Sequence, residues 1–188
     1  MERTAVTSAK ERMLAGEPYR VDAELAAEAV RCHKLMDVFN ATASDDHEGR
    51  AQALADLLGE VGENAAVRPP LHVDYGHRIT LGEGVFVNFG AVMLDVAPIR
   101  VGAHTQMGPN VQLLTPTHPL EPAERKAGWE SAEPITIGEN VWLGGGVIVC
   151  PGVTIGDNTV VGAGAVVARD LPANVVAVGN PARVIKQI

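Results

Sequence analysis

The feature that most constrains this sequence is a six-residue repeat in its second half. From position 81 an apolar residue returns every six positions, with one slip of two residues and one long interruption, and glycine follows seven of the twelve. The repeat positions are Leu81, Val87, Met93, Val101, Met107, Leu113, Ile137, Leu143, Val149, Ile155, Val161 and Val167. A period of six matches neither the turn of an α-helix nor the alternation of a long strand. It predicts short strands joined by tight corners into a parallel β-helix.

Three such walls close one triangular coil, so residues about eighteen apart are expected to stack. The expected stacks are Ile137 over Ile155, Leu143 over Val161 and Val149 over Val167. We expect one residue of each wall to point inward, and the glycine beside it to adopt backbone dihedrals that a side chain would forbid. A core this narrow has little room for aromatic rings, which agrees with an aromatic content of 4%.

Length and composition agree with one β-helix domain and an appended segment. The chain has 188 residues, of which 46% are hydrophobic, enough for a core. Its formal charge of −8 argues against nucleic acid or an anionic membrane surface as the main partner, since both require a basic face. The sequence has no apolar run of about 20 residues that would span a bilayer, and its first residues lack the apolar segment of a signal peptide. We therefore expect a cytoplasmic protein.

Residues 1–60 are rich in Ala, Leu and Glu at helical spacing. Helices are predicted at about Ser8 to Ala15, Asp22 to Phe39 and Asp45 to Leu58. Asp22 is placed to cap the longest helix, and Gly59 or Gly62 to end the last one. We interpret this segment as a cover over the open end of the coil stack, since an exposed sheet end invites further strand pairing. Contact with substrate is an added role for it.

Two cysteines and two histidines fall into no ligand or disulfide pattern. Cys32 and Cys150 lie far apart in different segments and are interpreted as packing residues. His33 and His47, in the helical region, are interpreted as surface or packing residues.

Residues 114–134 interrupt the repeat without changing its register, because Leu113 and Ile137 are separated by a multiple of six. This excursion contains four prolines and a charged run, and it predicts an extruded loop. Long loops in compact domains are often functional. His118 stands where the wall gives way to the loop, so we expect its backbone to be held while its ring faces a neighbouring surface. Taken as an arbitrary loop histidine, it would be a solvated side chain.

Several short motifs accompany the repeat. They are Met13 to Glu17 followed by Tyr19, Asp74 to Gly76, Val87 to Phe89, Leu94 to Pro98, Thr117 to Leu120, Val141 to Gly146 and Gly179 to Arg183. Together with the hexapeptide repeat they resemble the maltose and galactoside O-acetyltransferases over nearly the whole chain. The resemblance implies a mainly β fold, a left-handed β-helix at residues 61–188 with its loop at 114–134, preceded by an α-helical domain at residues 1–60. It also implies acetyl-CoA as co-substrate and a homotrimer with three active sites between subunits.

The activity that the resemblance implies is transfer of an acetyl group from acetyl-CoA to a sugar hydroxyl. Such a hydroxyl is too weak an acid to ionise near neutral pH, so a base is required. Neutral imidazole accepts protons in that pH range. We predict that His118 removes the hydroxyl proton as the oxygen attacks the thioester directly, and then passes it to the departing thiolate. No acyl-enzyme, no nucleophilic cysteine or serine and no metal enter this mechanism.

On the acceptor side the resemblance points to Asn88 and Asp95, whose amide and carboxylate suit hydroxyl recognition. Without it, Asn88 would equally fill a corner and Asp95 make a turn bond. Glu130, in the second half of the loop, is a candidate to orient the base or to bind sugar, and is equally interpreted as solvated. Phe86, also counted as acceptor-binding, stands where galactoside enzymes have tyrosine, and Arg20 stands where the family has an acidic residue.

The donor requires a groove for its pantetheine arm, and cations or backbone N–H groups for its phosphates. The candidate donor-binding residues are Trp142, Gly145, Gly162, Ala163, Ala168, Arg169, Arg183 and Lys186. Small residues let the arm approach the backbone, and the N–H of Gly145 is a candidate oxyanion donor. Trp142 would equally pack at a subunit interface. Ala168 and Arg169 stand where the family usually carries threonine and lysine.

Three other functions remain open from the sequence. Another hexapeptide acetyltransferase would act on an antibiotic, an amino sugar or serine. A γ-type carbonic anhydrase uses the same coil with zinc held by three histidines. The candidate zinc ligands in this sequence are His72, His77, His104 and His118, and their spacing forms no compact ligand pattern. A non-catalytic scaffold is the third, and no residue pattern selects the acceptor sugar.

Overall fold

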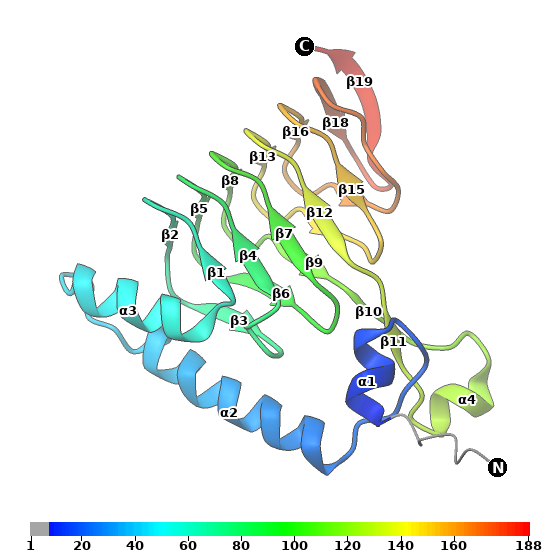
Figure 1. Ribbon diagram of the computed structural model, residues 1–188. Coiled ribbons are helices and arrows are strands. Elements are labelled where there is room, and N and C mark those ends of the chain that lie inside the picture. Colours follow the sequence, from blue (N-terminus) through cyan, green and yellow to red (C-terminus); the bar gives the residue numbers. More distant parts are fainter. Residues whose placement is uncertain (1–7) are drawn as a thin grey trace.

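The computed structural model describes residues 8–188, and three sheets form the walls of a β-helix (Figure 1). We name each sheet by its first strand. The β1 sheet contains β1 (Glu60–Val61), β4 (Ile79–Leu81), β7 (Ile99–Val101), β12 (Ile135–Ile137) and β15 (Thr154–Ile155). The β2 sheet contains β2 (Ala66–Val67), β5 (Phe86–Val87), β8 (Gln106–Met107), β13 (Trp142–Leu143), β16 (Val160–Val161), β18 (Val175–Val178) and the antiparallel β19 (Arg183–Gln187). The β3 sheet contains β3 (Leu71–Val73), β6 (Ala91–Leu94), β9 (Gln112–Leu114), β14 (Ile148–Val149) and β17 (Val166–Val167). The predicted parallel β-helix is thereby confirmed.

The predicted stacking of hexads is confirmed in each named pair. Ile137 pairs with Ile155, Leu143 with Val161 and Val149 with Val167. All twelve repeat positions are buried, with at most 2% of their surface exposed. The residue four positions after the repeat residue, for example Val85 or Val147, is buried as well. Each wall therefore buries two side chains rather than one, because residues two apart on a strand share a face.

The glycine after each repeat residue has a different role from the predicted one. None of those seven glycines has a positive φ. A Cβ on Gly144 would lie 2.5 Å from the nitrogen of Ala163 in the next coil, and one on Gly156 would lie 2.4 Å from that of Ala173. The close approach of successive coils therefore excludes a side chain. Positive φ occurs two residues later, at the corner itself, as at Asn158.

The coils differ in length. From β12 to β17, stacked partners are 18 residues apart, as predicted. In the last coil they are 16 apart, as between Val160 and Val176. In the first coils they are 20 apart, as between Thr80 and Arg100. The extra residues lie in the corner that leads from the β3 sheet back to the β1 sheet, at residues 74–78 and 95–98. The interruption at residues 114–134 occupies the same corner one coil later, so this edge departs from the repeat in three successive coils.

Three helices precede the β-helix, close to their predicted positions: α1 (Ala9–Leu14), α2 (Ala23–Asn40) and α3 (His47–Leu57). Asp22 caps α2 as expected, since its carboxylate accepts a 3.0 Å hydrogen bond from the N–H of Leu25. The last helix is not ended by a glycine, because Leu58 already adopts extended backbone. Gly59 belongs to the first coil, where a Cβ would lie 2.2 Å from the carbonyl oxygen of His77. Within residues 8–188, no helix combines the length and apolarity that a bilayer span requires.

Helices α2 and α3 cover the first coil of the β-helix (Figure 1). The side chain of Asn40, at the end of α2, donates to the carbonyl of Leu71 at 2.9 Å and accepts from its N–H at 2.8 Å. It satisfies backbone groups that a further strand would otherwise pair. Phe39 and Cys32 are buried in the core of the β-helix, and Cys150 packs against that core. Both cysteines are therefore packing residues, as interpreted, and helices and coils share one core.

The excursion at residues 114–134 leaves the wall as a hairpin, in agreement with the predicted extruded loop. Strand β10 (Pro116–Thr117) pairs antiparallel with β11 (Ser131–Ala132), and the short helix α4 (Pro122–Lys126) lies between them. A 2.7 Å hydrogen bond joins the hydroxyls of Thr117 and Ser131 at the base of the hairpin. Figure 1 shows the hairpin beside α1, so the loop at residues 114–134 lies next to the N-terminal segment.

Candidate active site

The irregular corner between the β3 and β1 sheets encloses a cavity of about 350 Å³. Its walls come from α2 and the residues before it, from the widened corners of the first coils, and from the hairpin. Its titratable lining residues include His33, Asp74, His118 and Glu130. The two-residue insertions and the loop build this cavity together because they widen the same edge of the β-helix.

His118 and Glu130 stand opposite each other across the hairpin, since His118 directly follows β10 and Glu130 directly precedes β11. Opposite positions on an antiparallel pair bring Cβ atoms within about 5 Å. Both residues also line a second hollow, of about 530 Å³. The side chain of His118 is exposed, so it stands at the mouth of both spaces.

Tyr19 ties the N-terminal segment to this hairpin. Its N–H donates to the carbonyl of Glu130 at 2.9 Å, and the N–H of Glu130 donates to the carbonyl of Tyr19 at 3.0 Å. The Tyr19 hydroxyl also donates to Oε2 of Glu130 at 3.0 Å. Burial, and then the charge of Glu130, raise the pKa of this hydroxyl, which keeps it a donor. Glu130 is therefore held in the cavity wall by a residue 111 positions away, rather than solvated.

Asp74 is a cavity residue that we did not select from the sequence. It follows β3 and shares the cavity with His33 and His118. Burial, and then the charge of Asp95, raise the pKa of Asp74 to about 6, while His33 acts in the opposite direction. Its place in the motif Asp74 to Gly76 was the available signal. His33 is exposed, which agrees with its interpretation as a surface or packing residue. It also lines this cavity, which its position on α2 alone does not show.

Asp95 lies behind the cavity wall rather than in it. Its side chain is fully buried. Its Oδ1 accepts from the N–H groups of Asp74 at 3.1 Å and Tyr75 at 2.8 Å, and its Oδ2 accepts from that of Arg78 at 3.3 Å. The expected contact of Asp95 with the acceptor does not fit this placement. Because all three donors belong to the corner before β4, Asp95 fixes the backbone that carries Asp74.

Asn88 and Phe86 lie on a different edge of the β-helix. Phe86 belongs to β5, and Asn88 follows that strand at the corner between the β2 and β3 sheets. Arg68 of the preceding coil lies 5.1 Å from the centre of the Phe86 ring and donates to Oδ1 of Asn88 at 3.5 Å. Neither of these acceptor candidates lines the cavity that contains His118. One protomer therefore does not bring them together with the predicted base.

Four donor candidates gather on the β2 sheet and its corner. Trp142, on β13, is 57% exposed, and Gly145 occupies the corner after that strand. Gly162 and Ala163 occupy the same corner one coil later, where the N–H of Gly164 donates to the carbonyl of Gly145 at 2.9 Å. Within residues 8–188 the N–H of Gly145 has no hydrogen-bond acceptor, so it is available to a ligand.

The remaining donor candidates lie in the last coil. Ala168 and Arg169 follow β17, whereas Arg183 and Lys186 belong to β19. All four are exposed. The structure thus places three cations at the C-terminal end of the β-helix, beyond the glycine corner, and none of them near His118 in the same protomer's cavity.

The histidines considered as zinc ligands occupy separate elements. His72 is on β3, His77 stacks edge-on against Tyr75, His104 occupies a corner with φ of 59°, and His118 follows β10. In the described part of the chain, no three histidine, cysteine, aspartate or glutamate side chains are grouped as metal ligands would be.

Comparison with known proteins places the chain in a family. Residues 12–62 match the maltose acetyltransferase hexapeptide capping motif, and residues 134–169 match the bacterial transferase hexapeptide with six repeats. The galactoside O-acetyltransferase of Escherichia coli is 41% identical over 179 residues, which cover 95% of this chain and 88% of that protein. The chain belongs to the maltose and galactoside O-acetyltransferase family.

Solved structures of this acetyltransferase family share the fold. The crystal structure of a maltose O-acetyltransferase from Clostridium difficile is 47% identical, with a TM-score of 0.95 over 96% of this chain and 97% of that one. A galactoside acetyltransferase in complex with coenzyme A is 38% identical, with a TM-score of 0.89 over 96% of this chain and 90% of that one. Membership of this family leaves the carbonic anhydrase and scaffold alternatives without support.

Proposed function

We propose that the protein transfers the acetyl group of acetyl-CoA to a hydroxyl of a sugar, with His118 as the general base. The observation that carries this proposal is the exposed His118 at the mouth of a cavity in a chain of this family. The same cavity offers Asp74 and Glu130, whose carboxyl oxygens accept hydrogen bonds from hydroxyl groups. A sugar seated there presents a hydroxyl to the imidazole.

The reaction needs only one proton carrier. His118 takes the proton of the acceptor hydroxyl while the oxygen forms a bond to the thioester carbonyl carbon. The carbonyl oxygen gains negative charge, which the free N–H of Gly145 is suited to stabilise. The C–S bond then breaks, and the leaving thiolate receives the proton from the imidazolium of His118. The products are the O-acetyl sugar and free CoA.

The complete site is proposed to form between subunits of a homotrimer. His118 and the glycine corner lie on different edges of one protomer, and Asn88 and Phe86 do not line the cavity of His118. A neighbouring copy that brings its β2 sheet against the hairpin would supply the missing groups. In that arrangement Trp142, Gly162 and Ala163 border the pantetheine arm.

The phosphates of CoA are proposed to bind at the C-terminal end of the β-helix. Arg169, Arg183 and Lys186 are exposed there, on a chain with a net charge of −8. Local cations are therefore required to attract an anionic donor. Ala168 precedes Arg169 and adds no polar contact of its own.

The test is an assay of CoA release from acetyl-CoA with a panel of sugars, comparing wild type with His118→Ala. Loss of a positioned general base is expected to lower kcat by about 10²- to 10⁴-fold, with the KM for acetyl-CoA little changed. His72→Gln is the matched control, because His72 lies on the exposed face of β3 outside the cavity. Retention of most turnover by His118→Ala would contradict the mechanism, and failure of every sugar would contradict the acceptor class.

A further inference from the structure

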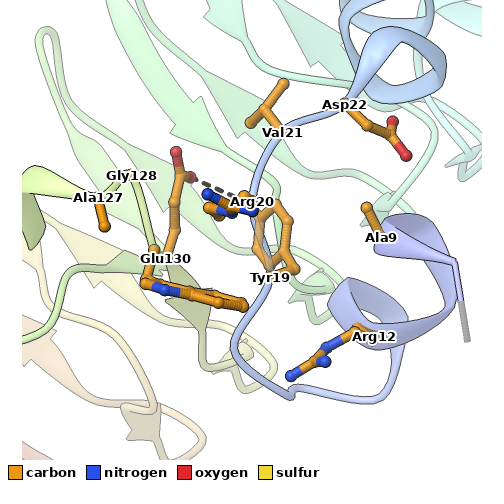
Figure 2. A pocket seen from close by; sticks show the side chains of 10 residues that line it. Ala9, Arg12, Tyr19, Arg20, Val21, Asp22, Ala127, Gly128 and Glu130 are labelled. Carbon is orange, nitrogen blue, oxygen red and sulfur yellow. Dashed lines mark hydrogen bonds between the residues drawn. The ribbon is translucent and has the colours of Figure 1, made fainter. Parts of the chain in front are cut away.

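A hollow of about 640 Å³ is not used by the chemistry proposed above. It lies between the N-terminal segment and the second half of the hairpin, and Figure 2 shows the side chains that line it. Those that offer polar groups are Arg12, Tyr19, Arg20, Asp22, Trp129 and Glu130. The dashed line in Figure 2 is the hydrogen bond from Tyr19 to Glu130, which holds the Glu130 carboxylate at this hollow.

This hollow adjoins the cavity of the predicted base. Tyr19, Val21 and Glu130 line both spaces. Glu130 also lines the hollow on which His118 opens, so this one residue borders three spaces. A ligand whose reacting hydroxyl lies at His118 therefore has room to extend past Glu130 into the larger hollow.

The position of Trp129 is fixed by the two arginines. The guanidinium carbon of Arg12 lies 5.6 Å from the centre of the indole ring, and that of Arg20 lies 5.2 Å from it. Arg12 is itself anchored, because its Nε donates to the carbonyl of Pro18 at 2.7 Å. Such cation–π contacts hold an aromatic ring in one orientation. Among the ion pairs of the described residues, none involves Arg20.

The charges around the hollow indicate which class of ligand it suits. The lining has two cations, Arg12 and Arg20, and two carboxylates, Asp22 and Glu130. Glu17, outside the lining, forms an ion pair with Arg12 at 3.9 Å. This balance disfavours a strongly anionic or cationic ligand. The same groups provide both donors and acceptors beside an aromatic ring, as a neutral molecule with many hydroxyl groups requires.

From these contacts we infer that the hollow beside Trp129 is a second sugar subsite, and that the preferred acceptor is a glycoside with at least two rings. This inference rests on the proposed sugar acetyltransferase function. One ring binds at His118, Asp74 and Glu130 and is acetylated. The second ring lies against Trp129 and exchanges hydrogen bonds with Arg20.

Binding is tested without catalysis by tryptophan fluorescence. The chain has two tryptophans, so Trp142→Phe leaves Trp129 as the sole reporter. Titration of this variant with maltose is expected to shift the emission of Trp129 at concentrations where glucose does not. Trp129→Phe, which reports on Trp142 alone, is the control. No response of Trp129 to maltose would overturn the subsite, whether or not the enzyme acetylates sugars.

Kinetics then test whether the subsite acts in acetyl transfer. In wild type, kcat/KM is expected to be higher for maltose than for glucose, and Trp129→Ala is expected to lower that ratio by about tenfold, the value of one good contact. Arg20→Gln is also expected to lower the ratio of kcat/KM for maltose to that for glucose. Arg31→Gln, an exposed arginine of α2 outside these spaces, leaves the ratio unchanged.

The two proposals fail in different ways. A ratio that is equal in wild type and Trp129→Ala, with sugars still acetylated, would overturn the subsite and leave the acetyltransferase standing. A maltose response of Trp129 without acetylation of any sugar would retain a sugar-binding hollow but contradict the proposed activity. Trp129→Phe keeps an aromatic ring beside both arginines. A ratio that Trp129→Phe retains and Trp129→Ala loses is therefore due to contact of the ring with sugar, and not to a loss of folding.

Discussion

Among single residues, Asp74 has the most informative electrostatic environment. Its pKa is raised from 3.8 to about 6, first by burial and then by the charge of Asp95. The native protein therefore binds more protons than the unfolded chain between these two values. By linkage, the stability that Asp74 contributes is present below about pH 4 and is lost as the pH rises through about 6. At neutral pH Asp74 is a partly desolvated carboxylate, which lowers the free energy of unfolding but keeps a charged acceptor in the cavity.

Asp74→Asn is accordingly expected to be more stable than wild type at pH 7.5, by on the order of 1 kcal/mol, and equally stable at pH 4. Denaturant unfolding at both pH values measures this difference. Asp37→Asn, an exposed position on α2, is the control and should show no such dependence on pH. An advantage of the same size at both pH values would show that desolvation of Asp74 is not its cause. The same variant is expected to lose acetylation activity, since it changes an acceptor in the cavity.

At the scale of elements, the β-helix favours glycine for two different reasons. Some glycines lie in close contact with the next coil, and others have a positive φ at a corner. Gly156→Ala places a Cβ 2.4 Å from a backbone nitrogen of the next coil, which cannot move aside easily. We expect it to destabilise by about 1–3 kcal/mol, the usual cost of overpacking. Gly164→Asn is the matched control, because a Cβ at Gly164 would meet no atom within 4 Å. Gly164 has a positive φ of +71°, and Asn110 has a positive φ at the same corner in an earlier coil. Thermal unfolding should show a lower midpoint for the first variant and a nearly unchanged one for the second.

The elements also show what the sequence can and cannot predict. The register of strands followed from the hexad residues, because each wall repeats a local pattern that every copy displays. Helix α2 followed from its apolar spacing and from Asp22. The role of the wall glycines did not, because contact between coils depends on residues about eighteen positions away. The cavity was beyond prediction for the same reason, since the bonds between Tyr19 and Glu130 leave no local signal in either segment.

For the molecule as a whole, the residues of the proposed site lie on separate edges of a protomer. His118 lies on the hairpin at one edge, and Asn88 lies at the corner between the β2 and β3 sheets. The proposed site between two neighbouring copies would account for both positions, and a cyclic trimer would repeat that contact three times. This arrangement makes a quantitative prediction for mixtures of two inactive variants.

Co-expression of His118→Ala with Asn88→Ala in equal amounts tests it. If each site takes His118 from one subunit and Asn88 from the next, every mixed trimer contains one site with both residues intact. Three quarters of random trimers are mixed, so about a quarter of wild-type activity is expected to return. If both residues served the same site from one subunit, every site would lack one of them and activity would stay at the level of the single variants. Size-exclusion chromatography with light scattering on each variant alone establishes that the trimer, and not a loss of assembly, underlies the result.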